Sequence, residues 1–237
     1  MNQAVIFKLV QGSEEWERHR LLYRNASEAA AVMELSPWMT RYMLWELKTS
    51  RRAVAQNYAM ARGVELEPLA RAAYEADTDH IMEPVVMVRG EYSASLDGML
   101  LDNSLILEIK CPLKGQESDT WQLAKQGKVQ DHYMAQIQHQ LMVWGAEVCD
   151  FFVFDGRSSG VCVRVQPDLE LQIRIQQAWD EFWGYIVRDE PPALTSSDTV
   201  VRTDRAWADA AKAFMDAKER AEKTAKAAED AKQRLVA

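Results

Sequence analysis

Residues 93–112 read SASLDGMLLDNSLILEIKCP, and this stretch decides the fold. Its two halves are rich in apolar and small residues, a pattern that favours β-strands. Asp102 and Asn103 lie between the halves and are typical turn residues. The sequence therefore predicts an antiparallel hairpin in which the numbers of paired residues sum to 205, as 102 and 103 do.

This register places Asp97 opposite Glu108, because 97 and 108 also sum to 205. Cross-strand partners project from the same face of a sheet with their Cβ atoms about 5 Å apart. Lys110 shares that face because it follows Glu108 by two residues. Unless a bulge at Gly98 shifts the register, the hairpin brings two carboxylates and one ammonium group together.

These three side chains suit metal-assisted hydrolysis of a phosphodiester. Mg²⁺ prefers hard oxygen ligands, and a bound metal ion polarises phosphate and lowers the pKa of a bound water. We expect Lys110 to position or deprotonate that water, and the backbone carbonyl of Ile109 to be a further ligand. Taken alone, the pattern of Asp97 with Glu108 and Lys110 also fits a solvated cross-strand ion pair.

Helices and strands are mixed along the chain. Helical periodicity predicts helices that start at Ser13 and near Ala26, and others over 40–49, 56–77, 117–126, 131–145, 168–188 and 204–235. Strand-like runs occupy 4–10, 81–88, 148–154 and 160–165. This order predicts an α/β (α+β) fold, with a central mixed β-sheet flanked by helices. The expected organisation is one domain over 1–190, a linker over 191–203 and a charged, Ala-rich C-terminal helix over 204–237.

Composition limits the classes of function. The chain has 237 residues and a net charge of −8, so it does not bind nucleic acid through bulk positive charge. Its three cysteines lack CxxC spacing, which argues against a disulfide framework and a zinc site. There is no run of 18 apolar residues and no signal-peptide pattern, so we expect a cytoplasmic protein without membrane contact.

Five stretches resemble, in order, motifs of the PD-(D/E)XK nuclease superfamily, and more closely the phage lambda exonuclease and YqaJ-type viral recombinase family. They are QGSEEWERHRLLYRNASEAAA (11–31), RGVELEPLAR (62–71), SASLDGML (93–100), LEIKCP (107–112) and YMAQIQHQLMV (133–143). The resemblance implies a restriction-endonuclease-like core with a C-terminal helical tail attached.

The resemblance also implies roles for individual residues. Asp97 and Glu108 match the metal-binding carboxylates, and Lys110 matches the catalytic lysine. Glu67 matches a helix acid that binds a second metal ion or a metal-bound water, although by itself it also reads as an exposed helix acid. Glu65 is two positions away and faces elsewhere on a helix.

A second group of residues matches those that hold a 5′ phosphate. Arg20, Ser27 and Ser95 supply guanidinium and hydroxyl donors, which suit a phosphate dianion. Ser27 equally fits a helix cap. Arg24 departs from the family pattern and adds a positive charge nearby.

The helix over 131–145 carries the family's YxxQ pair. Tyr133 and Gln136 lie one turn apart, and Gln136 is expected to donate to the same phosphate, while Gln138 completes the YxxQxQ string. The alternative for this helix is that Tyr133 packs in the core and the glutamines face solvent.

The resemblance implies a Mg²⁺-dependent 5′-to-3′ exonuclease, with Mn²⁺ as a substitute ion. Such an enzyme starts at the 5′-phosphorylated end of linear double-stranded DNA and leaves a 3′ overhang for phage-type recombination. It implies a ring-shaped homotrimer, a single-strand annealing recombinase as partner, and a phage or prophage protein in the bacterial cytoplasm.

Three other functions stay open. One is a PD-(D/E)XK endonuclease, which would cut closed circular DNA. Another is a Cas4 or RecB-like nuclease, although the iron–sulfur cluster of the Cas4 type needs four cysteines. The third, from a different class, is a catalytically inactive DNA-end-binding recombination scaffold.

Overall fold

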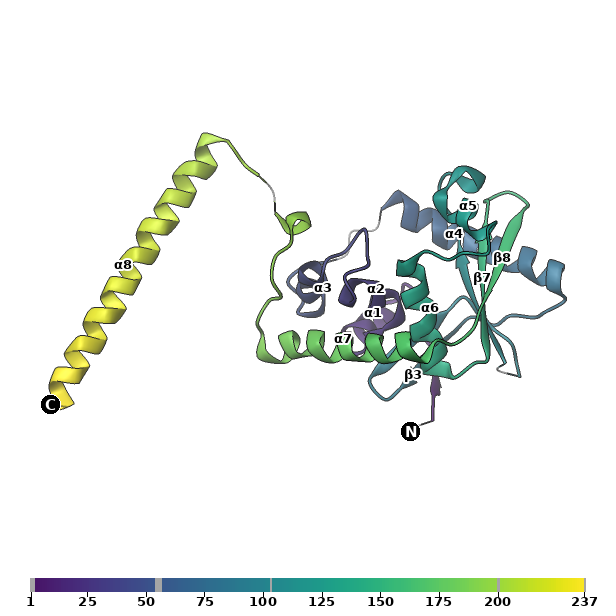
Figure 1. Ribbon diagram of the computed structural model, residues 1–237, viewed down its shortest axis with the longest axis horizontal. Coiled ribbons are helices and arrows are strands. Elements are labelled where there is room, and N and C mark those ends of the chain that lie inside the picture. Colours follow the sequence, from purple (N-terminus) through teal and green to yellow (C-terminus); the bar gives the residue numbers. More distant parts are fainter. Residues whose placement is uncertain (1–2, 54–56, 103, 200, 237) are drawn as a thin grey trace. The chain divides into compact units, whose positions relative to one another are not determined.

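The computed structural model describes residues 3–53, 57–102, 104–199 and 201–236, and the chain divides into two compact units, Met1–Thr195 and Ser196–Ala237 (Figure 1). Asn103, expected in the turn of the hairpin, lies outside the described residues. None of the helices in the described ranges is both long and apolar enough to cross a membrane.

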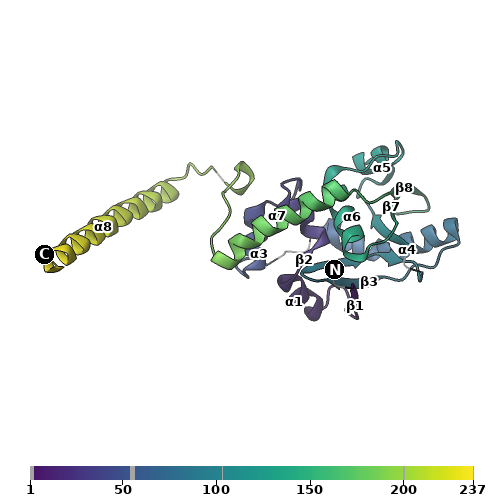
Figure 2. The same ribbon diagram turned by 60° about the horizontal axis from the view of Figure 1, so that its bottom comes forward.

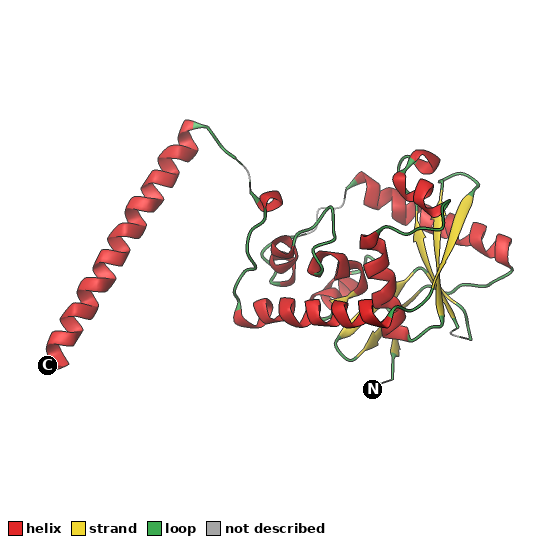
Figure 3. Ribbon diagram, in the orientation of Figure 1, coloured by secondary structure: helices red, strands yellow, loops and turns green. Residues whose placement is uncertain are grey.

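In the described part of the first unit, the strands form two four-stranded sheets (Figure 3). The first sheet has the order β1 (Val5–Phe7), β3 (Val85–Arg89), β4 (Tyr92–Leu96) and β2 (Arg24–Asn25). The second has the order β5 (Gly98–Met99), β6 (Leu105–Lys110), β7 (Val148–Phe154) and β8 (Gly160–Val165). Neighbours are antiparallel except for the parallel pairs β2–β4 and β6–β7. The predicted α+β class is confirmed, and the expected central sheet is divided in two.

The chain passes from one sheet to the other at Asp97, between β4 and β5. β5 pairs Gly98 with Leu107, so the register sum is the expected 205 and no bulge shifts it. Continued by one residue, this register sets Asp97 opposite Glu108. A Cβ atom on Gly98 would lie 2.7 Å from the Cβ of Met82, so close packing demands glycine beside Asp97.

Helices cover both faces of the second sheet, which explains why the residues of β6 and β7 are almost all buried. α4 (Tyr58–Thr78) packs Tyr74 against Leu107 and Phe152 on one face. α6 (Asp131–Trp144) packs on the opposite face, where Ile137 shares a core cluster with Phe151. Glu108 and Lys110 belong to this second face by strand alternation.

The first unit has further helices and 3-10 turns besides α4 and α6. They are α1 (Glu14–Leu22), the 3-10 turn Ala26–Glu28, α2 (Ala29–Val32), α3 (Arg41–Lys48), the 3-10 turn Gly115–Glu117, α5 (Asp119–Ala124) and α7 (Leu169–Arg188). A second apolar cluster, which includes Leu44 of α3 and Trp179 of α7, is formed mainly by α2, α3 and α7. In Figures 1 and 2, α7 runs beside α3 and α6, and all three are in contact with α2 or with each other.

The helix expected from Ala26 to residue 35 is shorter than predicted. It starts as a 3-10 turn and its α-helical part ends at Val32. Glu34 then takes a left-handed conformation with φ of 59°, and Ser36 and Pro37 follow. Because this backbone cannot continue an α-helix, a tight turn connects α2 to α3.

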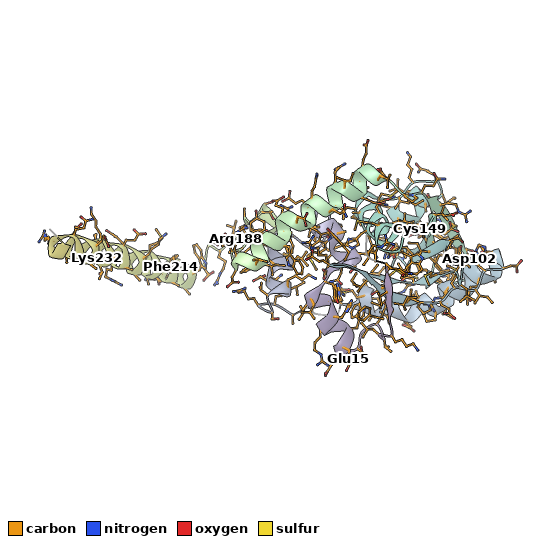
Figure 4. All side chains as sticks on the ribbon, turned by 90° about the horizontal axis from the view of Figure 1, so that it is seen from below. Glu15, Asp102, Cys149, Arg188, Phe214 and Lys232 are labelled. Atoms are coloured by element: carbon orange, nitrogen blue, oxygen red, sulfur yellow. The ribbon has the colours of Figure 1, made fainter. Side chains whose placement is uncertain are left out.

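The second unit consists of a 3-10 turn, Ser196–Asp198, and α8 (Arg205–Val236). Nearly all its described side chains are exposed, including Phe214, and Figure 4 shows the Phe214 and Lys232 side chains extending from the helix. Ion pairs one turn apart, such as Lys223 with Glu219 at 2.6 Å, stabilise this helix modestly.

Candidate active site

Asp97 is held by hydrogen bonds from two elements. Its carboxylate Oδ2 accepts from the backbone N–H of Ile109 at 2.7 Å, and its carbonyl accepts from Arg71 Nε of α4 at 2.7 Å. Burial and the neighbouring charge of Glu108 raise the pKa of Asp97 well above its usual value. Two buried carboxyl groups side by side, with the pKa of one raised, are typical of a functional site.

Glu108 is only 1% exposed, and donors surround both of its oxygens. Oε1 accepts from Lys110 Nζ and from Gln136 Nε2, the latter at 2.8 Å. Oε2 accepts from Gln140 Nε2 at 2.5 Å. Gln136 and Gln140 lie one turn apart on α6, and that helix therefore fixes both oxygens of the carboxylate.

Lys110 lies between the carboxylates of Asp97 and Glu108 and the ring of Tyr133. Burial alone would lower the pKa of Lys110, but Glu108 and Asp97 raise it above its usual value, so the side chain stays an ammonium ion. Its Nζ lies 5.2 Å from the centre of the Tyr133 ring. Tyr133 in turn packs 5.5 Å from Phe151, at the margin of the core, and its observed partner in the site is Lys110.

Glu67 faces the site and Glu65 does not. Glu67 forms an ion pair with Arg71 at 2.7 Å, and burial together with the charge of Glu108 raises its pKa despite that partner. Glu65 is exposed. The sequence prediction chose Glu67 over Glu65 by its motif, and the role of Glu67 stays a prediction.

A cavity of about 190 Å³ contains Asp97 and Glu108 together with residues expected to hold phosphate. It is lined by Gln11, Trp16, Arg20, Asn25, Ala26, Ser27, Ser95, Asp97, Glu108, Lys110 and Gln136. Residues from α1, α6, β4 and β6 therefore meet in one hollow, although more than 100 positions separate the first from the last.

Arg20 lines the same cavity as Lys110, and three neighbouring side chains contact its guanidinium group. Its guanidinium donates to Ser27 Oγ at 3.3 Å and to Glu28 at 3.2 Å, and it lies 4.6 Å from the centre of the Trp16 ring. The Trp16 indole N–H donates to Ser95 Oγ at 3.0 Å, which leaves the Ser95 hydroxyl hydrogen to donate elsewhere.

A buried ion pair supports Arg20, and sequence reasoning missed it. Lys48 of α3 contacts Glu28 at 2.6 Å, and its Nζ also donates to the carbonyls of Arg20 and Tyr23 at 2.6 and 2.7 Å. Burial would raise the pKa of Glu28, but Lys48 and Arg20 lower it below its usual value. Glu28 lies within the family-like stretch 11–31, directly after Ser27, so the sequence could have indicated it as a site residue. Lys48 lies in no such stretch.

Gln138 and Arg24 lie away from this cavity. Gln138 donates to the carbonyl of Gln166 at 2.8 Å and accepts from the backbone N–H of Asp168 at 2.8 Å, so it joins α6 to the start of α7. Arg24 is buried and pairs with Asp180 at 2.5 Å and Glu91 at 3.0 Å. Gln140, the third glutamine of α6, contacts Glu108 instead. It follows Gln136 by four residues, and this spacing, which puts both side chains on one face of the helix, was the signal that could have found it.

Asp97 and Glu108 fit a Mg²⁺ ion that has few protein ligands. Among the described residues no group of three or more His, Cys, Asp or Glu side chains is placed to hold a metal. Asp97 and Glu108 would therefore share the ion with a backbone carbonyl, such as that of Ile109, and with waters. Mg²⁺ is commonly bound through one or two carboxylates and keeps several waters, so this donor set fits it.

Comparison with known proteins identifies relatives with the same architecture. A family model described as YqaJ-like viral recombinase domain matches residues 15–147, more than half of the chain. An alkaline exonuclease from Laribacter hongkongensis, LHK-Exo, is 31% identical, with a TM-score of 0.62 over 75% of this chain and 94% of its own. The structure of LHK-Exo in complex with dAMP matches equally, with a TM-score of 0.63.

Two other relatives are more distant. A phage-related exonuclease from Haemophilus somnus shares the fold at 15% identity, with a TM-score of 0.56 over 73% of this chain and 98% of its own. The uncharacterized protein YqaJ of Bacillus subtilis is 27% identical over 198 residues, and this chain spans about 60% of its length. Taken with the motifs and the carboxylate-lined cavity, the family match shows that the chain belongs to the YqaJ-like viral recombinase family.

Proposed function

We propose that this protein is a Mg²⁺-dependent exonuclease that degrades linear double-stranded DNA from a 5′-phosphorylated end and leaves a 3′ single strand. One observation carries the proposal: the cavity that contains Asp97, Glu108 and Lys110 also contains Arg20 and the Ser27 and Ser95 hydroxyls. The similarity to an alkaline exonuclease supports nuclease activity.

The arrangement of charges explains a preference for ends. Arg20 and the two serines supply donors suited to a terminal phosphate dianion. The carboxylates then face the next phosphodiester along the strand. An internal stretch of duplex offers no terminal dianion, so this cavity favours an end over a continuous strand.

The chain's own residues divide the chemistry between them. When bound, the metal ion would polarise the phosphate and lower the pKa of a bound water. Asp97 and Glu108 would hold the ion, the Ile109 carbonyl would complete its protein ligands, and Glu67 would hold a water beside it. Because the pKa of Lys110 is raised, we assign it the role of a cation that orients the attacking water and stabilises charge developing on the phosphate.

The assembly and partners are further parts of the proposal. We infer a homotrimeric ring, an annealing recombinase that receives the 3′ strand, and Mn²⁺ as a substitute ion. Light scattering of the purified protein tests the trimer, since a monomeric mass would contradict it.

An assay with three DNA substrates tests the activity. The protein is incubated with Mg²⁺ and end-labelled linear duplex, with and without a 5′ phosphate, beside a closed circle. We expect degradation of the linear DNA alone, and faster degradation with the phosphate. Cleavage of the circle would instead indicate an endonuclease, and binding of ends without hydrolysis would indicate an inactive scaffold.

Variants test the assignment of residues in the same assay. Asp97→Asn and Lys110→Met should each reduce turnover to background. Glu65→Gln is the matched control for Glu67→Gln, because Glu65 is exposed and lies two residues away. The proposal requires the Glu67 variant to lose activity and the Glu65 variant to keep it.

A further inference from the structure

Three aromatic rings lead from Lys110 to the protein surface. Tyr133 lies under the Lys110 ammonium group, with 5.2 Å between Nζ and the ring centre. The His132 ring is centred 4.1 Å from that of Tyr133, and the Trp38 ring is centred 4.9 Å from that of His132 and 6.2 Å from that of Tyr133. We call Trp38, His132 and Tyr133 the aromatic ledge.

Trp38 is the outermost residue of the aromatic ledge, and 68% of its surface is exposed to solvent. Exposing so large an apolar ring costs free energy unless a ligand covers it. The Trp38 and His132 rings form a T-shaped pair, with an angle of 86° between their planes.

The turn that carries Trp38 is well ordered by its own contacts. Ser36 Oγ accepts hydrogen bonds from the backbone N–H groups of Trp38 and Met39 at 3.3 and 3.1 Å, and Pro37 restricts the backbone between them. The N–H groups of Leu35 and Ser36 both donate to the carbonyl of Ala30. The backbone that carries the exposed ring is therefore held in place, so a ligand that stacks on the ring has little backbone to order.

His132 points to the chemistry of that ligand. Burial and the charge of Lys110 lower the pKa of His132, so its ring is neutral near pH 7 and suits a base better than a phosphate. Within the described part of the chain, its Nε2 atom is buried and has no hydrogen-bond partner. A flat neutral ring beside an exposed indole fits a heteroaromatic ligand.

We propose that the aromatic ledge is a stacking subsite for a nucleobase of the strand being degraded, with Trp38 as its main contact. Lys110 places the reacting phosphate beside Tyr133, and the ledge continues from there, so it receives a base close to that phosphate. A base must leave its duplex partner to stack here, and the ledge therefore holds the end of the strand in a single-stranded form. Aromatic stacking on bases is tolerant of sequence, as degradation of arbitrary DNA requires.

The inference rests on the proposed function for the identity of the ligand, but its test does not depend on hydrolysis. Binding of a fluorescent, 5′-phosphorylated duplex with unpaired nucleotides at that end is measured by anisotropy in EDTA. The same DNA is prepared with a single abasic site at each unpaired position in turn. The proteins are the full chain, Trp38→Ala, Trp38→Tyr and, as a control, Trp207→Ala, which removes an exposed tryptophan of α8.

We expect Trp38→Ala to weaken binding about tenfold, within the range found for stacking of one base, and Trp38→Tyr to retain most of the affinity. An abasic site at the stacked position should weaken binding to the full chain and leave Trp38→Ala unaffected, because the two changes remove the same contact. Trp207→Ala should bind every probe as the full chain does.

Two results would overturn the inference. One is an equal loss for Trp38→Ala on intact and abasic DNA at every position, and the other is a change in oligomeric mass that accounts for the loss and marks Trp38 as a subunit contact. Hydrolysis of the same DNA with Mg²⁺ is measured in a separate assay. Base-dependent binding without hydrolysis would contradict the proposed function alone, whereas hydrolysis without a Trp38-dependent abasic effect would contradict the stacking subsite alone.

Discussion

Glu108 shows how single side chains prepare this site. A buried carboxylate is costly unless donors surround it, and Lys110, Gln136 and Gln140 provide them here. Asp97 accepts one backbone hydrogen bond at its carboxylate, and burial together with the charge of Glu108 raises its pKa. Side-chain donors thus hold Glu108 in place on both of its oxygens, whereas Asp97 has fewer such contacts.

Gln140 offers a test of this positioning. Gln140→Ala removes the donor to Glu108 Oε2, and residues that orient metal ligands typically contribute 10- to 100-fold to activity, so we expect a loss of about that size in kcat. Gln138→Ala is the control on the same helix, because it removes bonds to Gln166 and Asp168 instead. It should lower the free energy of unfolding by about 1–3 kcal/mol and leave kcat close to normal. Equal losses of kcat in both variants would contradict the assignment.

His139 predicts how stability depends on pH. Burial lowers its pKa to about 3, whereas an unfolded histidine titrates near 6.5. Between these values the unfolded chain binds the additional proton, so the free energy of unfolding falls as the pH falls, by about 1.4 kcal/mol per pH unit. We expect His139→Gln to show a shallower slope in urea unfolding from about pH 6.5 downward. Parallel slopes for the two proteins would count against a buried, neutral His139.

At the scale of elements, Lys48 of α3 supports the part of the cavity that contains Arg20. Removing one partner of a buried ion pair typically costs 3–5 kcal/mol, because the other charge is left uncompensated. We expect Lys48→Met to destabilise the protein by about that amount and to free Arg20 from its position. The preference for 5′-phosphorylated over 5′-hydroxyl ends should then fall, with a larger effect on KM than on kcat.

A double variant separates positioning from simple loss of stability. Lys48→Met combined with Glu28→Gln removes both charges, so it should be more stable than Lys48→Met alone, as judged by urea unfolding. If the double variant regains stability but not the preference for a 5′ phosphate, Glu28 and Lys48 position Arg20. Full recovery of the preference would show that the pair acts through stability only.

The elements also show what the sequence could predict. The hairpin register followed from arithmetic because an assumed two-residue turn fixes every pair beyond it, and the pairs Gly98–Leu107 and Met99–Ile106 have the expected register. Helical periodicity located α6 but did not say which of its glutamines face the sheet, since Gln136, Gln138 and Gln140 are all polar. The Glu28–Lys48 pair was missed because a contact across 20 residues between two short helices has no local pattern.

At the scale of the whole molecule, the net charge of −8 constrains how the proposed enzyme would hold DNA. The cations of the cavity are already engaged, Arg20 with Glu28 and Lys110 with Glu108. A phosphate entering the cavity must therefore compete with these acids or arrive with a cation that neutralises them. Metal binding and DNA binding should accordingly reinforce each other, as opposite charges brought into one buried site do.

The second unit gives the last prediction. Because nearly all described side chains of α8 are exposed, removing residues 196–237 takes away little buried apolar surface. The chain 1–195 should therefore keep its free energy of unfolding to within about 0.5 kcal/mol, and it should keep its kcat and its oligomeric mass, as measured by urea unfolding, the linear-duplex assay and light scattering. A lower oligomeric mass by light scattering, with unchanged stability of the subunit, would contradict this view. It would show that the exposed side of α8, which includes Phe214, is covered in the assembly.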